Sequence, residues 1–255
     1  MLGDTVDGSG PIALLGSGEY LAVMDETDAG LVQAVGGKEL AHVALMATAC
    51  ALEEGEPERW NQLGLGHFLP LAGRASAIPL LRRDDAEAEG VLDLLRQANI
   101  FYFSGGSPQY LIDTMANTAA WQVIQSRLRE GAAIAGCSAG AIMLGSYRVN
   151  LRAILAGDPP SWGEAMGIVP RLAVLPHFDR GRRRLGDEAM AEVLTTILEL
   201  GPADAVLAGI EEDTALVRTA NEGGRWWQVK GRQNVVLYTR GARPHVLSPG
   251  DTLRL

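Results

Sequence analysis

The sequence has few of the residues that build metal centres and disulfide frameworks. It holds only two cysteines and four histidines in 255 residues. Cys50 and Cys137 each follow an expected strand and show neither a disulfide framework nor metal-ligand spacing. No H-x-x-x-H pair occurs among the histidines, which are His42, His67, His177 and His245. We therefore predict no metal, no disulfide and no cofactor.

Basic residues are in the minority, and long apolar runs are missing. The 22 basic residues against 31 acidic ones give a formal net charge of −9, which argues against nucleic acid or an anionic membrane as the main partner. No apolar run approaches the length of a membrane span, and the opening segment MLGDTVDGSG lacks the basic region of a signal peptide. We expect a cytoplasmic protein that binds neither nucleic acid nor membranes.

The chain does contain a regular alternation of apolar strands and helical segments. Strands are predicted at residues 12–15, 42–48, 75–80, 99–103, 132–136, 172–175, 205–210 and 215–219. Helices are predicted up to about residue 34 and over residues 54–68, 84–97 and 108–130, the last segment holding one or two helices. Short apolar strands joined by helices predict an α/β fold with a mostly parallel sheet covered by helices on both faces. The tail, at residues 226–227, 235–239 and 253–255, predicts antiparallel strands that close the sheet. We predict a single domain over residues 1–255, with residues 1–10 as a flexible leader.

One strand leads into the segment Gly136-Cys137-Ser138-Ala139-Gly140, which has the pattern G-x-S-x-G of a nucleophile elbow. Glycines flank Ser138 because strand and helix backbones come too close there for side chains. The following helix directs its positive dipole end at the serine, and the Ala139 N–H is free to bind an oxyanion. A plain turn with an N-cap serine is the alternative. Cys137 fits less well as a nucleophile, since its frame places Ala139 where a glycine is needed.

A second glycine loop, Ser104-Gly105-Gly106-Ser107, follows the predicted strand at 99–103. Its backbone N–H groups could approach a substrate carbonyl, so Gly106 is our second candidate oxyanion donor and Gly105 a substrate-binding candidate. Gln109 opens the next helix and could bind substrate through hydrogen bonds. The segment Gly16-Ser17-Gly18 lacks the remaining residues of a dinucleotide or phosphate loop, so neither ligand is expected.

A histidine and an arginine cluster follow the strand at 172–175. His177 is a candidate general base for Ser138, and a structural histidine is the alternative. Four arginines occupy five positions, Arg180-Gly181-Arg182-Arg183-Arg184, in an otherwise acidic protein. Arginines bind carboxylates in bidentate fashion, so the cluster indicates an acidic substrate, with a solvated helix start as the alternative.

The acid that would orient His177 is left open by the residues alone. Glu211, Glu212 and Asp213 lie between two predicted strands, while Asp158 lies between the serine and the histidine in the loop at 157–163. Asp179 is only two residues from His177, too near to fold back onto the ring.

These motifs, in this order, resemble the cyanophycinase and aspartyl dipeptidase (dipeptidase E-like) serine peptidases. The resemblance rests on Gly105-Gly106, the elbow, His177-Phe178 with its arginines, and the segment Gly209 to Ala215. It implies the flavodoxin-like fold of class I glutamine amidotransferases, Ser138 as nucleophile, His177 as base and Glu212 as the orienting acid. A homodimer is a further expectation of the family.

The chain also departs from the cyanophycinase pattern. Those enzymes have an Asp-Gln pair before the histidine, where this chain has Leu175-Pro176. Arg180 and Arg182 match the spacing of the family's arginines, and the third is Arg183 or Arg184. The resemblance therefore favours a serine peptidase acting on small peptides beside an aspartyl residue, including β-linked forms. An Asp-Arg polymer exopeptidase, a ligand-binding protein without catalysis and a glutaminase are the alternatives.

Overall fold

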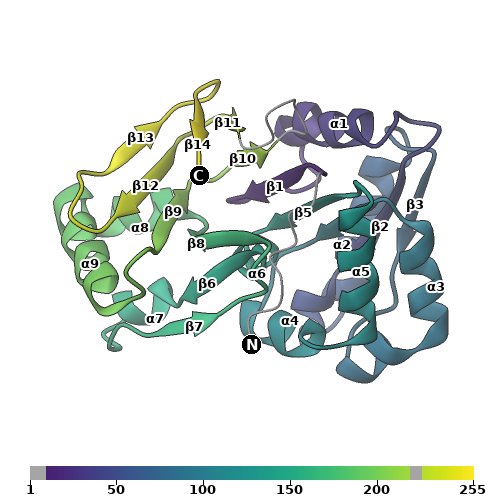
Figure 1. The fold of residues 1–255 in the computed structure, drawn as a ribbon, viewed down its shortest axis with the longest axis horizontal. Helices are drawn as coiled ribbons and strands as arrows, with labels where there is room; N and C mark the ends of the chain where they lie inside the picture. Colours follow the sequence, from purple (N-terminus) through teal and green to yellow (C-terminus); the bar gives the residue numbers. More distant parts are fainter. Residues whose placement is uncertain (1–9, 219–225) are drawn as a thin grey trace.

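The computed structural model describes residues 10–218 and 226–255, and the strands within them form two sheets (Figure 1). The first sheet has eight strands in the order β14-β11-β10-β1-β5-β4-β2-β3. They are β1 (Ile12–Leu15), β2 (His42–Met46), β3 (Arg74–Ala77), β4 (Ile100–Phe103), β5 (Ala133–Cys137), β10 (Thr214–Arg218), β11 (Trp226–Gly231) and β14 (Thr252–Arg254). Strands β1 to β5 are parallel. Strands β10, β11 and β14 extend the sheet on the free side of β1, each antiparallel to its neighbour. The predicted parallel sheet is confirmed.

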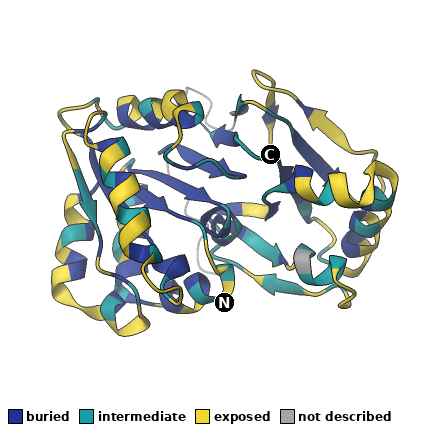
Figure 2. Ribbon diagram, turned by 180° about the vertical axis from the view of Figure 1, so that it is seen from behind, coloured by how far each residue is buried: buried dark blue, intermediate teal, exposed yellow. Residues whose placement is uncertain are grey.

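Helices cover both faces of this sheet, as strand β1 illustrates. Its residues Ile12 and Leu14 pack in one buried cluster with residues of α3 and α5, and Ala13 and Leu15 pack in another with residues of α1 and α2. The central strands are buried along their length (Figure 2). The helices are α1 (Asp25–Ala34), α2 (Glu56–Phe68), α3 (Glu89–Gln97), α4 (Pro108–Met115), α5 (Ala119–Arg129) and α6 (Ala139–Leu144).

A second, six-stranded sheet has the order β13-β12-β9-β8-β6-β7. It comprises β6 (Gly145–Val149), β7 (Trp162–Glu164), β8 (Val169–Leu175), β9 (Val206–Ile210), β12 (Val235–Thr239) and β13 (His245–Leu247). Helices α7 (Leu151–Leu155), α8 (Phe178–Leu185) and α9 (Asp187–Leu200) belong to this half. The sequence pattern predicted one sheet; instead, the tail strands divide between two, and β6 and β7 were not expected.

Some element boundaries also differ from the predictions. The segment 84–97 is a 3-10 turn, Arg83–Glu87, followed by α3, whereas the segment 108–130 holds two helices, which is one of the two predicted arrangements. Asn117 separates α4 from α5 with a φ of 59°. Of the leader predicted at residues 1–10, residues 1–9 lie outside the described residues, and Gly10 is buried. Within the described ranges, no helix combines the length and apolarity needed to cross a membrane.

The register of the first sheet brings three loops together. Leu15 pairs with Cys137, and Phe103 pairs with Gly136, so β1, β4 and β5 end at the same edge. Ligand sites of parallel sheets form beyond the carboxyl ends of strands. The glycine loop after β4 and the elbow after β5 therefore meet at one place.

Candidate active site

Ser138 occupies a strained turn between β5 and α6. Its backbone has φ 51° and ψ −107°, a conformation that costs a residue other than glycine of order 1–3 kcal/mol. A Cβ on Gly136 would lie 2.4 Å from the backbone of Gly140, and a Cβ on Gly140 would lie 2.4 Å from the Phe103 carbonyl oxygen. Only glycine permits this close approach of strand and helix, which presents the Ser138 hydroxyl at the sheet edge.

Two residues that share the pocket with Ser138 have backbone N–H groups without a hydrogen-bond partner among the described residues. They are Ala139, the first residue of α6, and Gly106 in the loop after β4. Gly106 has a φ of 139°, and a Cβ there would lie 2.3 Å from the Ala49 carbonyl oxygen. Both residues line the same pocket as Ser138. Their N–H groups are therefore available to an oxyanion.

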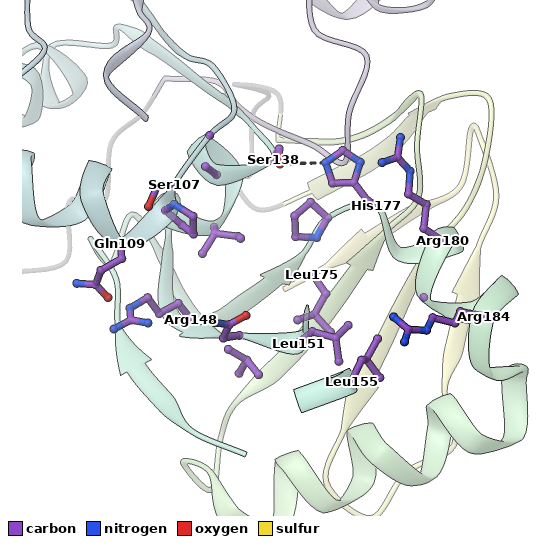
Figure 3. Close-up of a pocket in the computed structure, with 18 residues that line it drawn as sticks. Ser107, Gln109, Ser138, Arg148, Leu151, Leu155, Leu175, His177, Arg180 and Arg184 are labelled. Carbon is purple, nitrogen blue, oxygen red and sulfur yellow. Dashed lines mark hydrogen bonds between the residues drawn. The ribbon is translucent and has the colours of Figure 1, made fainter. Parts of the chain in front are cut away.

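His177 reaches Ser138 from the second sheet. It follows β8 in the left-handed conformation, with φ 51° and ψ 36°. Its backbone N–H donates to the Gly16 carbonyl oxygen at 3.3 Å, which ties the loop after β8 to the loop after β1. The ring Nε2 lies 3.0 Å from Ser138 Oγ (Figure 3). The two sheets thus each contribute one member of a hydrogen-bonded pair.

Glu212 binds the other side of the imidazole. Its Oε1 lies 3.0 Å from His177 Nδ1 and also forms an ion pair with Arg180 Nη2 at 2.5 Å. Partial burial raises the pKa of Glu212, but the hydrogen bonds from His177 and Arg180 outweigh that effect and lower it below its usual value. A carboxylate beside Nδ1 fixes the tautomer that leaves Nε2 free to accept a proton from Ser138.

The other candidate acids lie elsewhere. Glu211 is buried and binds the Arg182 Nη1 at 2.6 Å and the Asn234 N–H at 2.9 Å. Asp158 is exposed. Asp179 accepts the Glu212 backbone N–H at 3.0 Å, so it holds the backbone of Glu212 and makes no bond to the histidine ring. Of the acids considered from the sequence, Glu212 makes the contact with His177.

The arginine cluster divides between the pocket and the surface of α8. Arg180 and Arg184 line the pocket beside Ser138. Arg182 does not, because its guanidinium binds Glu211 and Asp187. Arg183 pairs with Asp179 at 2.5 Å. The structure therefore brings Arg180 and Arg184 to the site and leaves Arg182, which we had expected to bind substrate, outside it.

The pocket has a volume of about 550 Å³ and is lined by residues from both halves of the molecule. Gln109 lines it, with its amide donating to Asp113 Oδ1 at 2.7 Å, whereas Gly105 does not line it. Sequence reasoning missed one wall, which comes from β6 and α7. No carboxylate occurs among the described residues of the lining. The lining from the missed wall consists of Arg148, Val149, Asn150, Leu151 and Leu155.

Glu19 is another residue to which the sequence analysis gave no role. This largely buried side chain accepts the Gly105 N–H at 3.2 Å and the Cys137 thiol at 2.7 Å. Burial, followed by the nearby charge of Glu19, raises the pKa of Cys137. The thiol therefore stays protonated and unreactive, which agrees with serine as the residue at the elbow.

Comparisons with known proteins place this geometry in a family. The model of Peptidase family S51 matches residues 13–223. A crystal structure of a peptidase from an acI-B1 Actinobacterium is 34% identical, with a TM-score of 0.80 over 96% of this chain and 97% of that chain. A protein from Listeria monocytogenes EGD-e assigned to peptidase E is 16% identical, with a TM-score of 0.52 over 94% and 98%, and shares the fold. No curated protein matches. With most of its length matched by the family model, the chain belongs to peptidase family S51 and is a peptidase.

Proposed function

We propose that this peptidase hydrolyses small peptides beside an acidic residue, through a Ser138-His177-Glu212 triad and an acyl-enzyme. The observation that carries the proposal is the unbroken series of contacts from Ser138 Oγ to His177 Nε2 and from His177 Nδ1 to Glu212 Oε1, each 3.0 Å long. A nucleophile, a base and an acid in contact are the minimum set for acyl transfer by serine.

The reaction follows from the position of each group. Ser138 Oγ attacks the scissile carbonyl carbon while His177 Nε2 takes its proton. The N–H groups of Ala139 and Gly106 hold the oxyanion that forms. His177 then donates its proton to the leaving amine, and the C–N bond breaks to give the acyl-enzyme. Water, deprotonated by His177, attacks the ester and releases Ser138 and the acid product.

The acidic specificity rests on the charge of the pocket. Three arginines, Arg148, Arg180 and Arg184, line it, and the described lining has no carboxylate, although the whole chain carries a net charge of −9. Arg180 is partly neutralised by Glu212, whereas Arg184 has no ion pair within the described residues. Positive charge that opposes the sign of the protein is expected where a carboxylate of the substrate binds.

The charge of the pocket and the contact between Ser138 and His177 weigh against two of the alternatives. An Asp-Arg polymer needs an acidic partner for the substrate arginine, and the described lining offers none. A binding protein without catalysis would have no need of the 3.0 Å contact between Ser138 and His177. Acidic dipeptides, α-linked or β-linked, are therefore the substrates we favour.

Labelling with a small fluorophosphonate tests the activation of Ser138. We expect one adduct by intact-mass measurement in the wild type and none in Ser138→Ala, because a fluorophosphonate reacts with a serine whose proton can be taken by a base. On an aspartyl dipeptide, Ser138→Ala should lower kcat by roughly 10⁴-fold or more.

Ser126→Ala is the matched control, since Ser126 is an exposed serine on α5, away from the pocket. It should label and turn over as the wild type does. Equal hydrolysis of the dipeptide by Ser138→Ala would contradict the proposal.

A further inference from the structure

Arg148 is a charged residue of the pocket to which neither the sequence motifs nor the proposed triad gives a task. It lies on β6, is half-buried and lines the pocket. Its Nε is fully buried without a hydrogen-bond partner, and its guanidinium makes no ion pair with any described residue. Elsewhere near the site, Arg180, Arg182 and Arg183 each pair with a carboxylate.

The guanidinium of Arg148 is packed against strand β7. Arg148 is paired with Gly163 in the β6–β7 register, and a Cβ on Gly163 would lie 2.7 Å from Arg148 Cζ and 2.8 Å from its Nε. Glycine at this position leaves the space that the guanidinium fills. The side chain is therefore held in place by contact with the backbone, without a charged partner of its own.

An unpaired guanidinium in a partly buried position is costly. Buried charges are normally paired, because removal from water without a compensating partner is unfavourable. The described lining of the pocket holds no carboxylate that could serve Arg148. A carboxylate supplied by a bound ligand would remove this cost, and a planar guanidinium can bind one through two parallel hydrogen bonds.

The direction of the reaction indicates which part of the substrate lies near Arg148. His177 must donate a proton to the leaving amine, so the leaving group lies on the side of His177 and Arg180. Figure 3 shows Arg148 and Gln109 on the other side of the pocket, away from Arg180 and Arg184. With the leaving group beside His177, the acyl residue of a bound substrate would extend to that side.

We propose that Arg148 binds the side-chain carboxylate of the acyl residue and so makes this peptidase specific for an acidic residue at that position. The assignment rests on the proposed function for its substrate class, and it places the acidic selectivity on β6, apart from the arginine cluster after His177. Arg180 and Arg184 then face the leaving group.

Binding of free L-aspartate, compared with L-asparagine, tests the assignment by calorimetry without catalysis. The two ligands differ only in the side-chain carboxylate. We expect the wild type to bind aspartate more tightly, Arg148→Met to lose roughly 10- to 100-fold of that affinity, and asparagine binding to change little. Arg148→Lys keeps the charge but not the planar guanidinium that forms two parallel hydrogen bonds, so it should lose less affinity for aspartate than Arg148→Met.

Arg129→Met is the charge-matched control, because Arg129 is exposed at the end of α5 and outside the pocket. It should bind aspartate as the wild type does. Thermal melting of Arg148→Met should show no loss of stability, since the variant removes an unpaired buried group. If it fails to fold, Arg148→Lys carries the test.

The outcomes separate this inference from the proposed function. Equal aspartate binding by wild type and Arg148→Met, or no preference of the wild type for aspartate over asparagine, would overturn the role of Arg148. Failure of Ser138 to label, with aspartate binding still dependent on Arg148, would overturn the serine chemistry alone.

Discussion

Ser138 and His177 are held by opposite means, although they are in contact. The surroundings of Ser138 are buried backbone and small side chains, with Cys137 and Ala141 fully inaccessible. The surroundings of His177 are charged and partly open, with the side chain of Glu212 21% exposed and that of Arg180 63% exposed. One side of the site is positioned by packing and the other by ionic hydrogen bonds.

This contrast separates what can perturb each side. Packed backbones resist small changes of pH and salt, but they do not tolerate an added atom. Ionic hydrogen bonds between partly exposed groups tolerate changes of volume, but they depend on protonation. Changes of volume on the Ser138 side should therefore affect folding, and changes of charge on the His177 side should affect turnover and its dependence on pH.

Gly136→Ala should give the largest effect. The new Cβ would lie 2.4 Å from the backbone of Gly140, so β5 and α6 must move apart, at a cost of order 3 kcal/mol in the free energy of unfolding. Urea denaturation measures this cost. Labelling of Ser138 by fluorophosphonate should also be lost, because the elbow would open.

Gly66→Ala is the matched control for added volume. Gly66 is exposed on α2, and no atom lies within 4 Å of a Cβ placed there. The substitution should stabilise the protein by about 0.5–1 kcal/mol, as alanine does in place of glycine within a helix. Similar free energies of unfolding for the two variants would contradict the view that packing positions the elbow.

Glu212→Gln should leave the fold intact and reduce turnover. An amide cannot stabilise the imidazolium and can favour the wrong tautomer of His177, so we expect kcat to fall roughly 10³- to 10⁴-fold. Asp158→Asn, which changes an exposed acid of the loop at 157–163, should keep wild-type kcat. A loss of less than tenfold in Glu212→Gln would exclude Glu212 as the orienting acid.

The wild type and Glu212→Gln also differ in how their stability depends on pH. The pKa of Glu212 is lowered in the folded chain, so its charged form stabilises the fold above the ordinary glutamate pKa, and this contribution disappears as the pH falls through the lowered value. The difference in unfolding free energy between wild type and Glu212→Gln should therefore shrink as the pH falls below about 4.3. Stability curves recorded over that range check the sign.

The contrast also explains which parts of the site could be predicted from the sequence. Ser138, His177 and Glu212 each follow a short apolar strand, and the carboxyl ends of such strands are where sites form. Strands β6 (Gly145–Val149) and β7 (Trp162–Glu164) have neither an apolar run nor clear alternation, so the sequence pattern predicts no strand in the wall that carries Arg148.

Contacts made across long stretches of sequence were the other part that could not be predicted. Glu19 contacts Gly105 and Cys137, which lie 86 and 118 residues away. Arg182 lies outside the pocket because its guanidinium binds the buried Glu211, 29 residues later in the sequence. A single charged residue gives no periodic sequence pattern from which its partner could be predicted. The partner depends on how the sheets pack.

Glu19→Gln should give the smallest effect, because Glu19 acts on the packed side of the site without facing the substrate. The amide oxygen can still accept the Gly105 N–H, but its NH₂ group would face the Cys137 thiol, which now donates to Glu19 Oε2. A slight tilt of the glycine loop would misplace the Gly106 N–H, so we expect kcat to fall about tenfold with KM nearly unchanged. Cys137→Ala leaves the bond to Gly105 intact and should keep kcat within about twofold of wild type, since it removes the thiol without placing a second donor against it. A rise in KM at constant kcat in Glu19→Gln would instead place Glu19 in substrate binding, and an equal loss of kcat in Cys137→Ala would show that the thiol contact positions the elbow.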